Sequence, residues 1–175
     1  SEVEKVLREA EEIAKKNEED NRRVNDRSEK IIEENERRNR KVHKESEDIV
    51  RDLERLAAEG KDARDLERKA RELVKRNKEV NDTSRRDLER LVKENRDVNK
   101  ESREDIERLV KELEKAGVDE EEVRKLVEKL ERLLEKSKRD DEESIKKARE
   151  LLRRSEEADK KLIREAEEAI RTRKK

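Results

Sequence analysis

The stretch NEEDNRRVNDRSEKIIEENERRN, residues 17–39, decides how this chain folds. It places asparagine at positions where the spacing of the neighbouring Val and Ile residues predicts the buried face of a helix. At about 100° per residue, one arc of about 120° holds six side chains: Val24, Ser28, Ile31, Ile32, Asn35 and Asn39. The asparagines therefore belong to the buried face and not to the solvent face.

The same pattern returns along the whole chain with a period of 18 residues. In the first repeat the pattern contains Asn17, Asn21, Val24 and Asn25. Eighteen residues later it returns as Asn35, Asn39, Val42 and His43. Eighteen residues at 3.6 per turn make five whole turns, so a stripe with this period runs parallel to the helix axis. The period predicts long, nearly straight helices.

Composition favours helices and excludes several classes of partner. Of the 175 residues, 60% are charged and 27% hydrophobic, and the chain has no aromatic residue and no Pro. Abundant Glu, Lys, Arg, Leu and Ala with no Pro favour helix over disorder. Because 52 basic residues balance 53 acidic ones, no net field would attract nucleic acid or an anionic membrane.

No constellation of residues indicates catalysis, and we expect no enzyme, no cofactor and no metal site. His43 is the only histidine, and the chain has no Cys that could share a metal with it. Asp141 and Asp159 lie about 27 Å apart along one helix, which is too far for a two-carboxylate mechanism. No apolar run approaches the roughly 18 residues of a membrane span, and no signal peptide is visible. We therefore expect a chain that is soluble when expressed in a cytoplasm, although its location is unknown.

Two glycines mark the ends of helices. Gly60 in LAAEGKDARD and Gly117 in EKAGVDEEE each follow a helical pattern, and Asp62 and Asp119 can cap the helices that come next. The chain then divides into helices of about residues 2–58, 63–115 and 120–174. Short turns make consecutive helices antiparallel neighbours. We predict an all-α fold, an antiparallel three-helix bundle with residues 1–175 as a single domain.

Pairing arithmetic predicts which polar residues meet. If the second helix folds back at Gly60, the numbers of facing residues sum to roughly 120, and folding back at Gly117 gives sums near 236. The resulting layers are Asn21/Asn99/Ser137, Asn25/Asn95/Asp141, Asn39/Asn81/Ser155 and His43/Asn77/Asp159. The full predicted core polar network is Asn17, Asn21, Asn25, Asn35, Asn39, His43, Asn77, Asn81, Ser84, Asn95, Asn99, Ser102, Ser137, Asp141, Ser155 and Asp159.

The repeated NxxxNxxVNxxS units, the core without aromatic residues, the Glu/Lys/Arg surface and the loops AEGKD and AGVDE resemble computationally designed helical bundles with buried hydrogen-bond networks. The resemblance covers the whole chain. It implies a parametrically generated backbone with a structural function, as a scaffold, one half of a heterodimer or a switchable cage.

Two interpretations of purpose remain open at the level of sequence. In the first, the chain is a self-sufficient monomeric bundle that requires no partner. In the second, it is an incomplete bundle that binds a fourth helix or a second copy of itself. Apolar residues outside the predicted core arc would favour the second interpretation, and the sequence has few of them.

Overall fold

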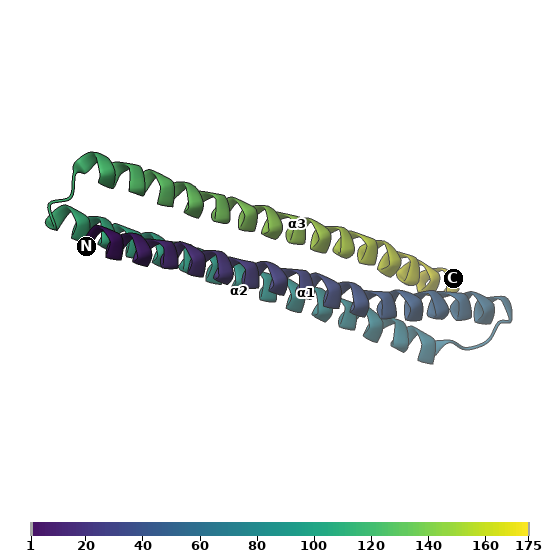
Figure 1. Cartoon of the computed structure of the whole chain (residues 1–175). Helices are drawn as coiled ribbons and strands as arrows, with labels where there is room; N and C mark the ends of the chain where they lie inside the picture. Colours follow the sequence, from purple (N-terminus) through teal and green to yellow (C-terminus); the bar gives the residue numbers. More distant parts are fainter. Residues whose placement is uncertain (1, 175) are drawn as a thin grey trace. The chain divides into compact units, whose positions relative to one another are not determined.

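The computed structural model describes residues 2–174, apart from the side chains of residues 2, 166, 169, 170 and 172–174. Three helices account for nearly all of it: α1 (Glu2–Ala58), α2 (Arg64–Lys115) and α3 (Glu120–Lys174) (Figure 1). They contain 57, 52 and 55 residues. No strand occurs in the described part, and the predicted all-α three-helix-bundle class is confirmed.

Both helix ends at the glycines adopt the Schellman geometry. Gly60 has a φ of 69°, and its N–H donates to the carbonyl of Ala57 at 3.2 Å. The N–H of Lys61 donates to the carbonyl of Leu56 at 3.0 Å. These two bonds satisfy carbonyls that the end of α1 would otherwise leave unpaired.

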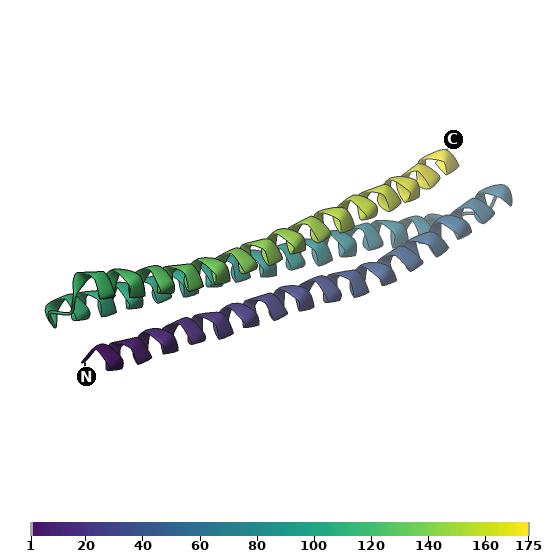
Figure 2. The same ribbon diagram turned by 45° about the horizontal axis from the view of Figure 1, so that its top comes forward.

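The second turn repeats this arrangement. Gly117 has a φ of 73° and donates to Glu114 at 3.2 Å, while Val118 donates to Leu113 at 3.3 Å. Figure 2 shows this turn at the same end as the start of α1. The helix after the first turn, α2, begins at Arg64, one residue later than the sequence predicts. The Arg64 N–H donates to Asp62 Oδ1 at 3.1 Å, so Asp62 still caps α2.

The chain forms two compact units, each built from part of every helix. Unit 1 comprises Ser1–Glu29 and Glu89–Lys147, and unit 2 comprises Lys30–Leu88 and Ala148–Lys175. That residues 1–175 form a single domain therefore stays a prediction.

Unit 1 has an apolar core near the α2–α3 turn. Its buried side chains are Val6, Ala10, Ile106, Leu109, Leu113, Val123 and Leu130. Val118, the residue after Gly117, packs against this cluster, as expected for a hydrophobic contact that closes a Schellman turn. The same contact therefore fixes both the turn and the start of α3.

Unit 2 has a smaller apolar cluster, which consists of Ile32, Leu88, Ala148 and Leu152. Leu53 and Leu73 are also buried in this unit. The remaining buried positions are largely polar, and they include Asn35, Asn39 and Asn77. Polar side chains thus occupy interior positions that leucine or isoleucine would ordinarily fill.

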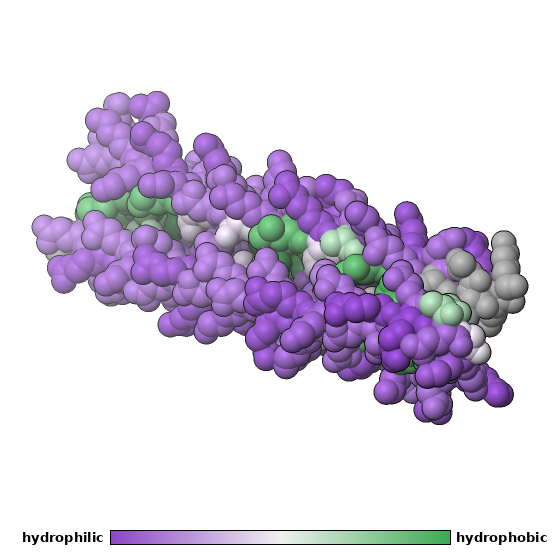
Figure 3. Space-filling model, turned by 90° about the vertical axis from the view of Figure 1, so that its right-hand side faces the viewer, coloured by the Kyte–Doolittle hydropathy of each residue, from purple (hydrophilic) through white to green (hydrophobic). Residues whose placement is uncertain are grey.

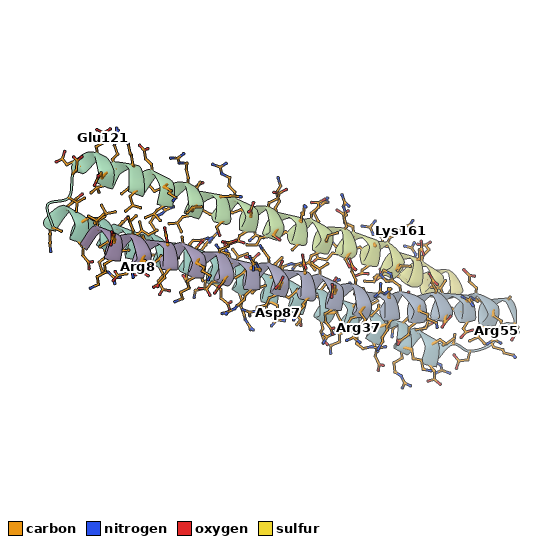
Figure 4. The ribbon with its side chains drawn as sticks, in the orientation of Figure 1. Arg8, Arg37, Arg55, Asp87, Glu121 and Lys161 are labelled. Carbon is orange, nitrogen blue, oxygen red and sulfur yellow. The ribbon has the colours of Figure 1, made fainter. Side chains whose placement is uncertain are left out.

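Charged side chains cover the outside of the helices. Arg8, Arg37, Asp87 and Lys161 project away from the ribbon in Figure 4. On the face shown in Figure 3, the surface is mostly hydrophilic and apolar side chains emerge only in small patches. Exposed pairs such as Arg38 with Glu34, at 2.8 Å, add little to stability because water screens their charges.

Replacing Gly60 with Ala tests the role of the left-handed turn residue. A Cβ at Gly60 would meet no atom within 4 Å, so the substitution introduces backbone strain without a steric clash. We expect Gly60→Ala to lower the free energy of unfolding by about 1–2 kcal/mol, measured by urea denaturation. Gly60→Asn, which tolerates this backbone conformation better, should cost less. Equal stability of the alanine variant and the parent would contradict this role.

Candidate functional site: two buried polar networks

Asn21 is the centre of a buried hydrogen-bond network in unit 1. Its Nδ2 lies 3.1 Å from Asn17 Oδ1, 3.1 Å from Asn99 Oδ1 and 2.6 Å from Ser137 Oγ. Its Oδ1 accepts a hydrogen bond from Asn95 Nδ2 at 3.1 Å. One α1 side chain therefore contacts polar groups on its own helix, on α2 and on α3.

Three further contacts extend this network along the unit. Asn17 Nδ2 donates to Ser102 Oγ at 2.8 Å, and Asn95 Nδ2 donates to Asp141 Oδ2 at 2.7 Å. Asn99 Nδ2 lies 3.4 Å from Asn95 Oδ1. All the unit 1 residues in the sequence-predicted set except Asn25 are linked by these bonds, and Asn25 joins them through Asp141.

Asn39 has the same arrangement in unit 2. Its Nδ2 lies 3.1 Å from Asn35 Oδ1, 3.1 Å from Asn81 Oδ1 and 2.7 Å from Ser155 Oγ. Its Oδ1 accepts from Asn77 Nδ2 at 3.1 Å. The four partners of Asn39 are the repeat counterparts of the four partners of Asn21.

The two networks differ at their carboxylates. Asn81 Nδ2 donates to Asp159 Oδ2 at 2.7 Å, whereas Asn77, which the sequence paired with Asp159, donates to Asn39. The second oxygen of Asp159, Oδ1, contacts His43 Nε2. Asp159 therefore faces an amide and an imidazole.

Two contacts were not assigned from the sequence, although its pairing rule contains them. Asn35 Nδ2 donates to Ser84 Oγ at 2.8 Å, as Asn17 does to Ser102. Both pairs have residue numbers that sum to 119, close to the expected 120. Asn17, Asn35, Ser84 and Ser102 belong to the predicted network but to none of the predicted three-residue layers, so the layers do not contain these two contacts.

Asp141 is a buried carboxyl group with amide partners. Its side chain is 1% exposed, and burial raises its pKa. Hydrogen bonds from Asn95 and Asn25 oppose this effect, while the neighbouring charge of Asp140 adds to it. Asn25 Oδ1 is buried without a hydrogen-bond partner. Burial is the larger effect, so the protonated form of Asp141 is favoured more in the folded chain than in solution.

The described residues contain no group of three or more His, Cys, Asp or Glu side chains that could hold a metal ion. No helix in the described part of the chain is long and apolar enough to cross a membrane. The two buried polar networks are therefore the candidate functional site of the described residues.

Comparison with known proteins places the fold. No protein-family model matches the chain. No curated protein matches it either. Among solved structures, the chain is similar to a computationally designed three-helix bundle, with a TM-score of 0.51 and 20% sequence identity. The similarity covers 98% of this chain and 88% of the other, and at this identity it shows the fold alone.

The raised pKa of Asp141 predicts a specific pH dependence. Above its ordinary value of 3.8, the folded chain retains a proton that the unfolded chain releases, so this contribution to stability falls as pH rises through the folded pKa. We compare the free energy of unfolding of the parent with that of Asp141→Asn. The difference, parent minus variant, should be greatest near about pH 4 and should fall toward about pH 7. Urea denaturation across this range measures it.

The control for this measurement is Asp97→Asn, because Asp97 is an exposed carboxylate in the same unit. Its pH profile should run parallel to that of the parent. Parallel profiles for the parent and Asp141→Asn would show that burial of Asp141 does not affect proton binding.

Proposed function

We propose that this chain is a designed structural scaffold without catalytic activity, in which buried polar networks specify how the helices align. The observation that carries the proposal is the pair of network centres, Asn21 and Asn39. Each lies within hydrogen-bond distance of four side chains, and the two partner sets are related by the 18-residue repeat.

The physical basis is the cost of leaving a buried polar group unpaired. Sliding α2 by about two turns can bring the buried Leu91 to the level of Asn21 and the buried Leu73 to the level of Asn39. Each amide would then face an apolar side chain, and its polar partners would be left unsatisfied. Each unsatisfied group costs about 1–3 kcal/mol. A uniform leucine core carries no comparable penalty, so it would discriminate less well between alignments.

Two further observations support a designed origin. The hydrogen-bond distances around the two centres agree closely, with three bonds of 3.1 Å in each network. The chain also has the fold of a computationally designed three-helix bundle. A backbone generated by repeating one unit would have this internal regularity.

Replacing one network centre and then the whole network tests the proposal. Asn21→Leu leaves the polar groups of Asn17, Asn95, Asn99 and Ser137 short of a partner, and should lower the free energy of unfolding by about 2–4 kcal/mol. Replacing every polar residue of the unit 1 network with apolar residues should recover that stability. Amide NMR spectra of this apolar variant should show more than one set of signals because alternative alignments become accessible.

Asn39→Leu is the matched variant, and its four equivalent partners predict a similar loss. A single sharp set of amide signals and an unchanged association state in the apolar variant would remove the proposed role in specificity.

A second candidate function is an interaction protein that binds a partner helix or a second copy. The observation that favours it is the exposure of Leu133 and Leu151, at 47% and 42%, which occupy the same position of the 18-residue repeat in α3. Each unit thus exposes one leucine of α3, and an exposed apolar side chain of this kind suits contact with a further helix.

Light scattering after size-exclusion chromatography separates the two functions. For the scaffold we expect the mass of one chain, 21.1 kDa, for both the parent and the double variant Leu133→Lys/Leu151→Lys. A parent mass near twice that value, which returns to one chain in the lysine variant, would favour self-association through these leucines.

A further inference from the structure

His43 is where the repeat changes its chemistry. The equivalent residue of the first repeat is Asn25, and each of the two side chains contacts the carboxyl group of its own unit, Asp141 or Asp159. Asp159 is 2% exposed and is held on its other oxygen by Asn81 Nδ2 at 2.7 Å. The imidazole is thus attached to a carboxylate whose position is fixed from a second helix.

This contact selects one tautomer of the neutral ring. A carboxylate accepts hydrogen bonds and does not donate them, so Nε2 carries the proton that faces Asp159 and Nδ1 carries the lone pair. Among the described residues Nδ1 has no hydrogen-bond partner, and it is open to solvent. The His43 side chain is 30% exposed, so part of the ring is accessible from solution.

A small cavity lies beside the pair. Its accessible volume is about 20 Å³, and its lining includes His43, Asp159, Val42, Leu73 and Leu162. That volume accommodates roughly one water molecule or a methyl group. The cavity thus has room for a methyl-sized group and not for a longer chain.

A small side chain accounts for the cavity at this level of unit 2. Ala70 lines it, and the residue at the equivalent position of the repeat is Leu88, which is buried. The smaller side chain leaves space that leucine would fill.

We propose that His43 is an acyl-transfer site for activated esters of short carboxylic acids, with Asp159 as its positioning residue. The Nδ1 lone pair attacks the carbonyl carbon and forms a carbon–nitrogen bond. The ester carbon–oxygen bond breaks, and the alkoxide or phenolate leaves with the electron pair. Water then attacks the acyl carbon, the carbon–nitrogen bond breaks, and the acid and one proton are released. The sum is ester hydrolysis, and it requires no other reactant.

This reactivity goes beyond the scaffold function and is independent of it. If His43 proves unreactive, the proposed role of the polar networks in alignment is unaffected. If the networks prove unnecessary for alignment, the contact between His43 and Asp159 still predicts the same chemistry.

The repeat supplies the matched variant, His43→Asn. It gives unit 2 the Asn that unit 1 already carries beside Asp141, so the fold should be retained. With p-nitrophenyl acetate as substrate, we expect this substitution to lower protein-dependent turnover by about tenfold or more. Equal turnover in the parent and His43→Asn would overturn the proposal.

Lysines also react with activated esters, and the nature of the adduct distinguishes them from His43. An acyl-imidazole is cleaved by hydroxylamine, whereas an acyl-lysine amide is stable. Mass spectrometry of the quenched reaction should locate a hydroxylamine-sensitive acetyl group on residue 43 of the parent. Hydroxylamine-resistant lysine adducts alone would count against the site.

Moving the histidine to the other network is the complementary test. The double variant Asn25→His/His43→Asn places an imidazole beside Asp141, and we expect it to recover most of the parent's turnover. Turnover that stays at the level of His43→Asn would contradict a role for the histidine–carboxylate pair.

The positioning role of Asp159 has its own readout. In Asp159→Asn, nitrogen-15 chemical shifts of the ring should show a smaller population of the tautomer protonated at Nε2, together with slower turnover. Unchanged shifts and unchanged turnover would overturn the role of Asp159.

Ala70→Leu fills the cavity, so it should reduce the preference for acetyl over hexanoyl esters. A preference unchanged by Ala70→Leu would show that the cavity does not select the acyl group.

Discussion

The structure depends on the requirement that a buried amide have hydrogen-bond partners. Asn21 and Asn39 each replace an apolar side chain in the interior, and each is compatible with burial only because partners on α2 and α3 lie at the correct level. The serine and aspartate side chains on α3 meet that requirement because they accept hydrogen bonds from asparagines of α1 and α2, and we propose that the helix alignment follows from it. Surface ion pairs are numerous, but their exposure makes them individually weak.

The sequence predicted the helices and most of the polar partners because helix geometry is nearly rigid. With a fixed rise and a fixed angle per residue, Asn21 must face Asn99 once the turn at Gly60 is known. The glycines could be assigned because a positive φ after a helix is strongly unfavourable for residues with a Cβ. The period of 18 then transferred each assignment from one repeat to the next.

The sequence could not predict features that depend on the choice among nearly equivalent donors. Asn77 and Asn81 lie one turn apart on the same face, and side-chain rotamers decide which of them reaches Asp159. The unpaired oxygen of Asn25 has the same origin, because an amide that points its Nδ2 toward a carboxylate turns its oxygen away from it. Division of the chain into two compact units also depends on local packing that periodicity does not describe.

The replacement of leucine by Ala70 has a mechanical consequence. A void in a folded protein is volume that unfolding removes, so hydrostatic pressure acts more strongly on a region that contains one. The space beside His43 therefore makes its surroundings the more compressible part of unit 2, and the side chains there have more room to change rotamer than those around Leu88 in the same unit. One missing leucine side chain thus gives a nearly periodic sequence a local difference in elasticity.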